Sequence, residues 1–206
     1  MRFLITAGPT REYIDPVRFI SNASSGKTGL ALAKAAIKAG HKVTLISSAC
    51  LNAPSKVKSV HAQTAQEMFT AVKKNLPLCD CLIMAAAVAD YTPVKKSKIK
   101  IKKTKKILTI KLKPTVDILK WASVHRKKTQ KVVGFALEDK NLKVNAEKKL
   151  KNKKLDMIIA NKPDVISADK TLVYIKTVNT AWRKIPAASK HAVAGKIICL
   201  IENLFA

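Results

Sequence analysis

The chain has 206 residues, of which 48% are hydrophobic, which suits one domain with a real core and excludes a disordered or low-complexity protein. Its 40 basic and 13 acidic residues give a net charge of +27, which favours an anionic partner. The longest apolar run, residues 81–89, is too short to span a bilayer, and the chain start lacks a signal-peptide pattern. We therefore expect a cytoplasmic protein with no membrane association.

The positive charge is concentrated in the second half of the chain. Residues 91–206 contain 29 basic and 8 acidic residues, whereas residues 1–90 contain 11 and 5. Thirty-five of the 40 basic residues are lysine, although arginine is preferred for bidentate contacts to bases and phosphates. A lysine-biased composition explains the excess about as well as an anionic ligand does, so local clusters carry more weight than the total.

Cysteine and histidine show no metal or disulfide pattern. The four cysteines are Cys50, Cys79, Cys81 and Cys199, with no Cys-x-x-Cys among them, and the four histidines are scattered. We therefore predict neither a zinc site nor a disulfide scaffold and leave any metal-ligating residues unknown. Cys79 and Cys81 alternate along a predicted strand, which favours core packing over thiol chemistry.

Strand and helix patterns alternate from the start of the chain. Residues 2–7 are predicted to form a buried strand, followed by a long irregular loop over residues 8–25. A loop of that length inside a compact domain is usually functional. A helix over residues 26–39 and a strand over residues 41–46 complete a βαβ unit.

The alternation continues to the C-terminus. Further helices are predicted at residues 64–74, 142–153 and 189–204. Further strands are predicted at residues 81–87, 131–135 and 155–160. A Thr-x-x-Glu capping box at Thr64 and Glu67 opens the first of these helices. The order predicts an α/β fold, a doubly wound and mostly parallel Rossmann-like sheet, with ligands at the carboxyl ends of its strands. No linker divides the chain, so residues 1–206 are expected to form a single domain.

Residues 97–112 alternate lysine with apolar residues on both sides of a central turn, which predicts a lysine-rich β-hairpin flap. Eight lysines lie between Lys95 and Lys106. They either protect a sheet edge from aggregation or gather at a ligand beyond the strand that ends at Asp90. The carboxylate of Asp90 can accept a hydrogen bond from a hydroxyl or cap the next turn.

Two further segments have the residue types of a phosphate site. Ser24 to Gly29 (SSGKTG) lies at a predicted helix start, but it is not a P-loop, because Ser21 stands where that motif has glycine. Phosphate binding and an ordinary helix entry explain this segment equally well. Lys149 and Lys153 are four residues apart on one helix face and can grip a polyphosphate, although a solvated face is the simpler interpretation.

Several motifs together resemble one known family. They are Ile5–Glu12, Asp15–Asn22, Ser24–Lys27, Ala86–Tyr91, Lys100–Lys103, Gly134–Glu138 and Lys149–Asn161. In this order they closely resemble phosphopantothenate–cysteine ligase of coenzyme A biosynthesis, over nearly the whole chain. Because the sequence begins at the ligase motif, we expect a stand-alone bacterial-type enzyme without the fused flavin decarboxylase domain and without FMN.

The resemblance implies a two-step reaction. The carboxylate of 4′-phosphopantothenate attacks the α-phosphate of CTP to give an acyl-CMP and pyrophosphate, and the amine of L-cysteine then displaces CMP. CTP is expected rather than ATP because the Lys100–Lys103 motif is like that of the CTP-using bacterial type. Mg²⁺ or Mn²⁺ with CTP and a homodimer are also implied, and a separate phosphopantothenoylcysteine decarboxylase is left open as a partner.

The resemblance also implies site residues. Those implied in catalysis are Asn22, Lys100 and Arg18. Those implied in nucleotide binding are Gly8, Ser24, Gly26, Gly29, Asp90, Lys100, Phe135, Lys149, Lys153 and Asn161. Those implied in substrate binding are Arg18, Asn22, Ala86, Ala87 and Asp90. Arg18 is expected from the other subunit, and Asn22 nearest the acyl intermediate, because an amide donates hydrogen bonds without being a nucleophile.

The sequence departs from the family at three places. Residues 113–117 differ from the usual Asn-Pro-Asp, Leu137 replaces an alanine, and the loop at residues 166–170 is short. These changes concern details of the pocket more than the reaction. Two alternatives stay open: a non-specific nucleic-acid-binding protein that uses its lysine surface, and a nicotinamide- or flavin-dependent Rossmann enzyme, which the missing glycine fingerprint disfavours.

Overall fold

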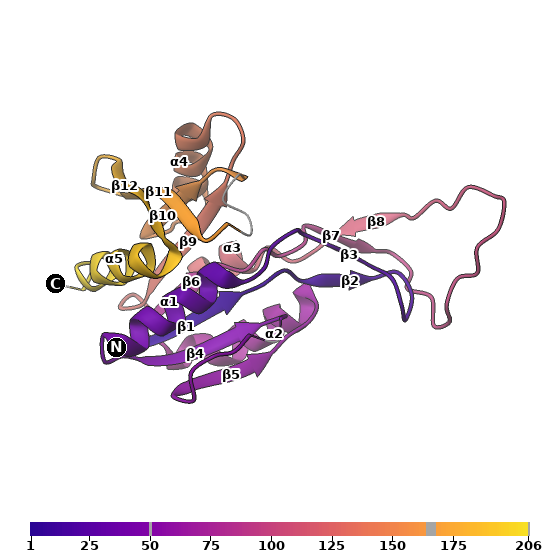
Figure 1. The fold of residues 1–206 in the computed structure, drawn as a ribbon, viewed down its shortest axis with the longest axis horizontal. Coiled ribbons are helices and arrows are strands. Elements are labelled where there is room, and N and C mark those ends of the chain that lie inside the picture. Colours follow the sequence, from indigo (N-terminus) through magenta and orange to yellow (C-terminus); the bar gives the residue numbers. More distant parts are fainter. Residues whose placement is uncertain (50, 164–167, 206) are drawn as a thin grey trace.

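A computed structural model, which describes residues 1–49, 51–163 and 168–205, builds the chain around an eight-stranded sheet (Figure 1). The parallel strands, in spatial order, are β5 (Val57–His61), β4 (Lys42–Ser47), β1 (Arg2–Ala7), β6 (Cys81–Met84), β9 (Lys131–Leu137) and β10 (Met157–Asn161). The antiparallel strands β11 (Lys170–Thr177) and β12 (Arg183–Ser189) extend the sheet beyond β10. The strand order reverses between β1 and β6, which is where doubly wound sheets bind ligands.

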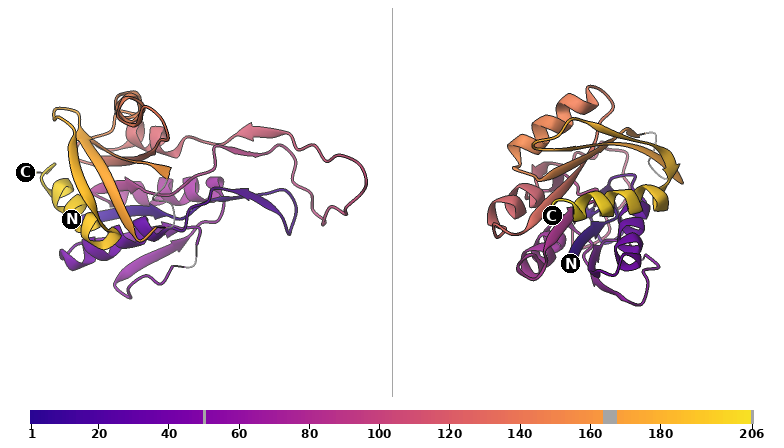
Figure 2. Two further views of the ribbon diagram at one scale, coloured as in Figure 1. Left: turned by 45° about the horizontal axis from the view of Figure 1, so that its top comes forward. Right: turned by 90° about the vertical axis from the view of Figure 1, so that its left-hand side faces the viewer.

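Helices cover both faces of the sheet (Figure 2). One face packs against α1 (Lys27–Lys38) and α5 (Lys190–Glu202). The other packs against α2 (Ala65–Asn75), α3 (Ile118–His125) and α4 (Leu142–Asn152), with the short 3₁₀ helix η1 (Leu76–Leu78) after α2. Phe3 and Ile5 of β1 point to the first face and Leu4 to the second. A strand buried on both faces must be apolar throughout, which explains the continuous run in β1.

The structure confirms the predicted α/β fold class and a half of the predicted capping box. The Thr64 hydroxyl accepts a hydrogen bond from the Glu67 backbone N–H at 3.1 Å. The Glu67 carboxylate, however, accepts from the N–H of Gln63 at 2.8 Å rather than from that of Thr64. Within the described residues, no helix combines enough length and apolar character to cross a lipid bilayer.

Two short antiparallel strand pairs project from the sheet, and we call residues 11–21 and 91–114 the arm (Figures 1 and 2). The first pair joins β2 (Arg11–Tyr13) to β3 (Phe19–Ser21). The second joins β7 (Tyr91–Pro93) to β8 (Leu112–Pro114). The prediction of a wholly irregular loop over residues 8–25 was therefore wrong, because β2 and β3 lie inside it.

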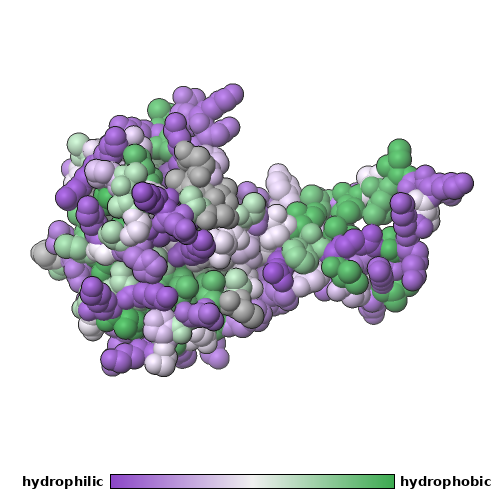
Figure 3. All heavy atoms as spheres, in the orientation of Figure 1, coloured by the Kyte–Doolittle hydropathy of each residue, from purple (hydrophilic) through white to green (hydrophobic). Residues whose placement is uncertain are grey.

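The predicted lysine-rich hairpin is present as a chain reversal, but its predicted strands are not. Pairing is confined to the base of the arm, and residues 99–111 contain no strand. A strand with one apolar face needs something to cover that face. Here Ile99 is 77% exposed and Ile107 95% exposed, so the described residues leave these apolar side chains uncovered. Figure 3 shows apolar side chains gathered on the arm between hydrophilic ones.

Candidate functional site

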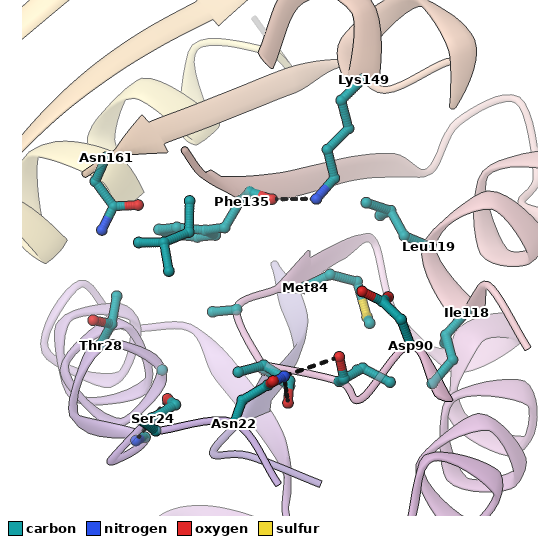
Figure 4. Close-up of a pocket in the computed structure, with 18 of the residues that line it drawn as sticks. Asn22, Ser24, Thr28, Met84, Asp90, Ile118, Leu119, Phe135, Lys149 and Asn161 are labelled. Atoms are coloured by element: carbon teal, nitrogen blue, oxygen red, sulfur yellow. Dashed lines mark hydrogen bonds between the residues drawn. The ribbon is translucent and has the colours of Figure 1, made fainter. Parts of the chain in front are cut away.

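A cavity of about 690 Å³ opens at the carboxyl ends of the central parallel strands. Its wall combines the start of α1, the loop after β6, the segment that leads into α3, the ends of β9 and β10, one face of α4 and the first residue of α5. These segments are far apart in sequence and meet only because the sheet aligns its strand ends. We call this cavity the pocket; Figure 4 shows most of its lining.

The α1 side of the pocket is built by close backbone packing. Gly8 and Gly26 both have positive φ, at 80° and 75°, a region that favours glycine. A Cβ on Gly26 would lie 3.1 Å from the Cα and N of Gly8, so the turn before α1 rests directly on the end of β1. Gly26 is the N-cap and, as a glycine, offers no side chain to cap α1. The first N–H groups of α1 can therefore bind an anion.

Asn22 fixes the opposite wall, the loop after β6. Its side-chain Nδ2 donates to the carbonyls of Ala87 and Val88, each at 3.2 Å (Figure 4). Both N–H donors of the amide are thus directed to the backbone. In this arrangement the amide positions the loop and leaves its oxygen as an acceptor, and the contact of Asn22 with an acyl intermediate stays a prediction.

Two buried threonines hold the same loop from beneath. The hydroxyl of Thr6 accepts from the Ala86 N–H at 3.1 Å, and the hydroxyl of Thr10 accepts from the Ala89 N–H at 2.8 Å. Both threonines are fully buried. Neither was given a role from the sequence, because each acts on a loop about 80 residues away along the chain.

The α4 side of the pocket supplies positive charge. Lys149 and Lys153 both line it, as expected for residues four apart on one helix face. The Nζ of Lys149 donates to the Phe135 carbonyl at 2.7 Å (Figure 4), and burial lowers the pKa of Lys149. The Nζ of Lys153 lies 2.8 Å from the Asp117 carboxylate.

Asp117 organises this side of the pocket. Its Oδ1 accepts from the Lys120 N–H at 3.0 Å and so caps the start of α3. Burial opposes ionisation of this carboxyl, but hydrogen bonds from Lys153 and the Lys120 backbone outweigh burial and lower the pKa of Asp117. The same carboxylate therefore fixes both a helix start and a pocket lysine.

Most of the residues that the resemblance implied line this pocket. They are Asn22, Ser24, Gly26, Gly29, Ala86, Ala87, Asp90, Phe135, Lys149, Lys153 and Asn161. Figure 4 shows Phe135 and Asn161, at the ends of β9 and β10, on the side of the pocket away from Asn22. Of the positions that depart from the family, Thr115, Asp117 and Leu137 also lie in the wall. Part of the shortened 166–170 loop, residues 166 and 167, lies outside the described residues.

Gly8, Arg18 and Lys100 do not line the pocket of their own chain. Gly8 lies beneath Gly26, as described above. Arg18 lies on the arm, where its guanidinium donates to the Asp15 carboxylate and to the Ile101 carbonyl. Lys100 is the residue before Ile101 and is exposed on the same arm. The convergence of Lys100 with Lys149 on the Ser24–Gly29 turn is therefore not achieved within one chain.

Sequence reasoning placed Lys27 and Glu138 in motifs without giving either residue a role, and it missed Lys190 as a pocket residue. Lys190 follows Ser189, which was a readable helix-start signal, but its place in the pocket depends on strands that the sequence did not predict. Among the described residues, no group of three or more metal-ligating side chains is present. Cys79 and Cys81 are buried in the core, as expected, and burial raises the pKa of Cys79 to about 12.

Comparisons with known proteins agree on one family. The model of the DNA/pantothenate metabolism flavoprotein C-terminal domain matches residues 1–204. The coenzyme A biosynthesis bifunctional protein CoaBC of Bacillus subtilis (strain 168) is 42% identical over 207 residues, 98% of this chain and 51% of that protein. A cysteine/cysteine sulfinic acid decarboxylase from an unknown prokaryotic organism is 47% identical over 162 residues, 78% of this chain and 45% of that protein.

The fold matches a solved structure over almost its whole length. The crystal structure of the C-terminal domain of a coenzyme A biosynthesis bifunctional protein CoaBC superposes with a TM-score of 0.83 at 39% identity. The match covers 98% of this chain and 94% of that one. The chain spans about half the length of the curated relatives that it matches.

Proposed function

Because this chain belongs to the family of the DNA/pantothenate metabolism flavoprotein C-terminal domain, we propose that it joins 4′-phosphopantothenate to L-cysteine in coenzyme A biosynthesis. The observation that carries the proposal is one pocket that combines an uncapped α1 start, the Asn22-held loop and two α4 lysines. The decarboxylase named above is matched over less than half its length, so its name supports no decarboxylase activity here.

The pocket suits a reaction between two anions. In the proposed first step, a carboxylate oxygen of 4′-phosphopantothenate bonds to the α-phosphorus of CTP, and the bond from that phosphorus to the bridging oxygen breaks to release pyrophosphate. The amine of cysteine then attacks the acyl carbon, forms the amide and expels CMP. Both steps need neutralisation of charge and alignment rather than a protein nucleophile.

The roles of the lining residues follow from their contacts. The first N–H groups of α1, with Ser24 beside them, bind phosphate oxygens. Lys149 and Lys153 neutralise the phosphate chain, and Phe135 and Asn161 lie where the nucleoside would extend. Asn22 shapes the Ala86–Ala87 wall against which the phosphopantothenoyl group would lie.

The nucleotide is proposed to be CTP, on the resemblance of Lys100–Lys103 to the CTP-using type. Mg²⁺ or Mn²⁺ would enter with CTP as part of that substrate. Divalent magnesium bound to a nucleotide needs only one or two carboxylates besides the phosphates, and Asp90 and Glu138 in the wall fit that demand. FMN has no part in this proposal, and the site of action is proposed to be the cytoplasm.

We propose a homodimer in which the arm of one subunit completes the pocket of the other. Arg18 and Lys100, the two implied catalytic residues outside the pocket, lie together on the arm and are joined through Ile101. Exposed apolar side chains on the arm, among them Phe19 and Tyr91, support its coverage by a second copy. A separate phosphopantothenoylcysteine decarboxylase would consume the product.

The test is a coupled assay on the purified chain. With Mg²⁺, CTP, 4′-phosphopantothenate and L-cysteine, we expect release of pyrophosphate and CMP, and much less product with ATP, GTP or UTP. Omission of cysteine should allow at most stoichiometric release of pyrophosphate. Absence of product with all four components present would refute the proposal, and equal use of all nucleotides would refute the assignment of CTP.

A further inference from the structure

A second pair of lysines lines the pocket, on the side of α1 and α5. Lys27 is the first residue of α1 and Lys190 the first of α5, and both belong to the cavity wall. Figure 4 shows Thr28, the neighbour of Lys27, across the cavity from Lys149. The pocket therefore has lysines on two sides, and the proposed function uses only those on the α4 side.

The antiparallel extension of the sheet brings Lys190 to this place. Lys170 at the start of β11 is paired with Ser189 at the end of β12. The residues next to that pair, Asp169 and Lys190, are joined by a backbone hydrogen bond from the Lys190 N–H to the Asp169 carbonyl at 3.0 Å. The added strands thus deliver a lysine and an aspartate to the rim of the pocket.

Lys190 is more buried than lysines usually are. It is only 8% exposed, so its side chain is held in the wall instead of extending into solvent as most lysines do. Burial lowers the pKa of Lys190, the nearby charge of Lys27 lowers it further, and Asp169 opposes both effects. Two lysines in the same part of the cavity wall give this side of the pocket a positive field that suits a polyanionic ligand.

Lys27 can exchange a protein partner, Asp169, for a ligand. Its Nζ lies 2.8 Å from Oδ1 of Asp169, but that carboxylate side chain is 89% exposed. An ion pair so open to water contributes little to stability. A phosphate group in the pocket therefore competes easily with Asp169 for Lys27.

We propose that Lys27 and Lys190 bind the pyrophosphate end of the nucleoside triphosphate, opposite the α4 lysines. This inference rests on the proposed function and assigns a binding site to its leaving group, pyrophosphate. As the bond from the α-phosphorus to the bridging oxygen breaks, the electron pair stays on the pyrophosphate oxygen, and the two ammonium groups neutralise that charge. Asp169 holds Lys27 when no phosphate is bound and gives it up when pyrophosphate enters.

The test is direct binding by calorimetry, which needs no turnover. Lys190→Met keeps the length of the buried side chain and removes its charge, and Lys196→Met, on the exposed face of α5, is the matched control. We expect Lys190→Met to weaken the binding of inorganic pyrophosphate and of CTP by about tenfold or more and to leave the binding of CMP unchanged. Lys196→Met should leave all three affinities unchanged, and Lys190→Arg should restore part of the pyrophosphate affinity.

Equal weakening of CMP and CTP, or no weakening of either, would overturn the assignment. A loss of affinity confined to 4′-phosphopantothenate would also overturn it, because Lys27 and Lys190 would then bind the phosphate of that substrate. Asp169→Asn, which keeps the backbone contact, should strengthen pyrophosphate binding several-fold, and unchanged or weaker binding would refute the exchange of partners. If pyrophosphate binds as expected but no ligase turnover occurs, only the proposed function fails.

Discussion

The body of the molecule and its arm are stabilised in different ways. In the body, helices cover both faces of the sheet, and strands such as β1 and β10 are buried along most of their length. The arm consists of two three-residue strand pairs and a long reversal, with Ile99 and Ile107 exposed. The body therefore buries its apolar side chains within one chain, whereas the described residues leave part of the apolar surface of the arm exposed.

This difference separates the two halves of the proposed site. The body fixes the pocket with contacts that belong to one chain, such as Asn22 to the Ala87 carbonyl and Lys149 to the Phe135 carbonyl. In the arm, the buried carboxylate of Asp15 fixes Arg18 and Ile101 relative to each other. Arg18 and Lys100, which the proposed site needs, therefore lie on the arm, the surface that we propose a second copy covers.

Removal of Lys149, the half-buried pocket lysine of α4, should have the largest effect. We expect Lys149→Met to lower kcat/KM for CTP by about 100-fold, because a charge near the reacting phosphates is lost where water cannot replace it. Lys148→Met, on the exposed side of the same helix, should change kcat/KM less than about twofold. Steady-state kinetics of pyrophosphate release measures both, and similar values for the two variants would contradict the role of Lys149.

A smaller effect, on stability, is expected where α1 packs on β1. A Cβ on Gly29 would lie 2.4 Å from the Cβ of Ala7, so Gly29→Ala must push the helix off the strand. We expect a loss of about 1–3 kcal/mol in the free energy of unfolding. Gly195→Ala in α5, where a Cβ meets nothing within 4 Å, should instead stabilise by about 0.5–1 kcal/mol. Urea unfolding measures both changes in the free energy of unfolding. Equal changes for Gly29→Ala and Gly195→Ala would refute the close packing of α1 on β1.

The smallest effect concerns the arm at acid pH. Hydrogen bonding from Arg18 holds the pKa of Asp15 well below its ordinary value, despite burial. A carboxylate with a lowered folded-state pKa stabilises above its unfolded value of about 3.9 and loses that contribution as the pH falls below it. Hydrogen exchange at the Ile101 amide, corrected for intrinsic rates, should therefore accelerate below about pH 4.

Asp15→Asn is the control for this pH dependence. The variant should show fast exchange at the Ile101 amide at neutral pH, with no further acceleration on acidification, while amides of β1 stay protected in both proteins. Acceleration of equal size in the variant would show that another group titrates.

The strands and helices that could be predicted are those whose pattern is complete within a short stretch of sequence. The buried strands β1, β6 and β10 are apolar runs in the sequence, and α1 and α4 show helical periodicity. The parallel sheet and the positions of its strand ends could therefore be predicted. β5 has Lys58, Ser59 and His61 exposed, and the antiparallel β11 and β12 have similarly mixed patterns. Such patterns also occur in loops of a chain with this composition.

The candidate site divides in the same way. Ser24, Asn22 and Lys149 belong to motifs that the sequence displays, and the sheet brings them together. Thr10 and Lys190 act through partners far along the chain, Ala89 in the first case and Asp169 in the second, so only the folded structure reveals them. The arm misled the prediction because alternation of lysine with isoleucine indicates a strand only where another surface covers the apolar side.

Subunit mixing tests most directly whether pocket and arm from different chains form one active site. Lys100→Ala alters only the arm and Lys149→Met only the pocket, and each variant alone should be nearly inactive. Co-expression or mixing with subunit exchange should restore about a quarter of wild-type activity, because half of the dimers are hybrids with one intact site each. Activity that stays at the level of the separate variants, in samples shown to contain hybrid dimers, would contradict the account.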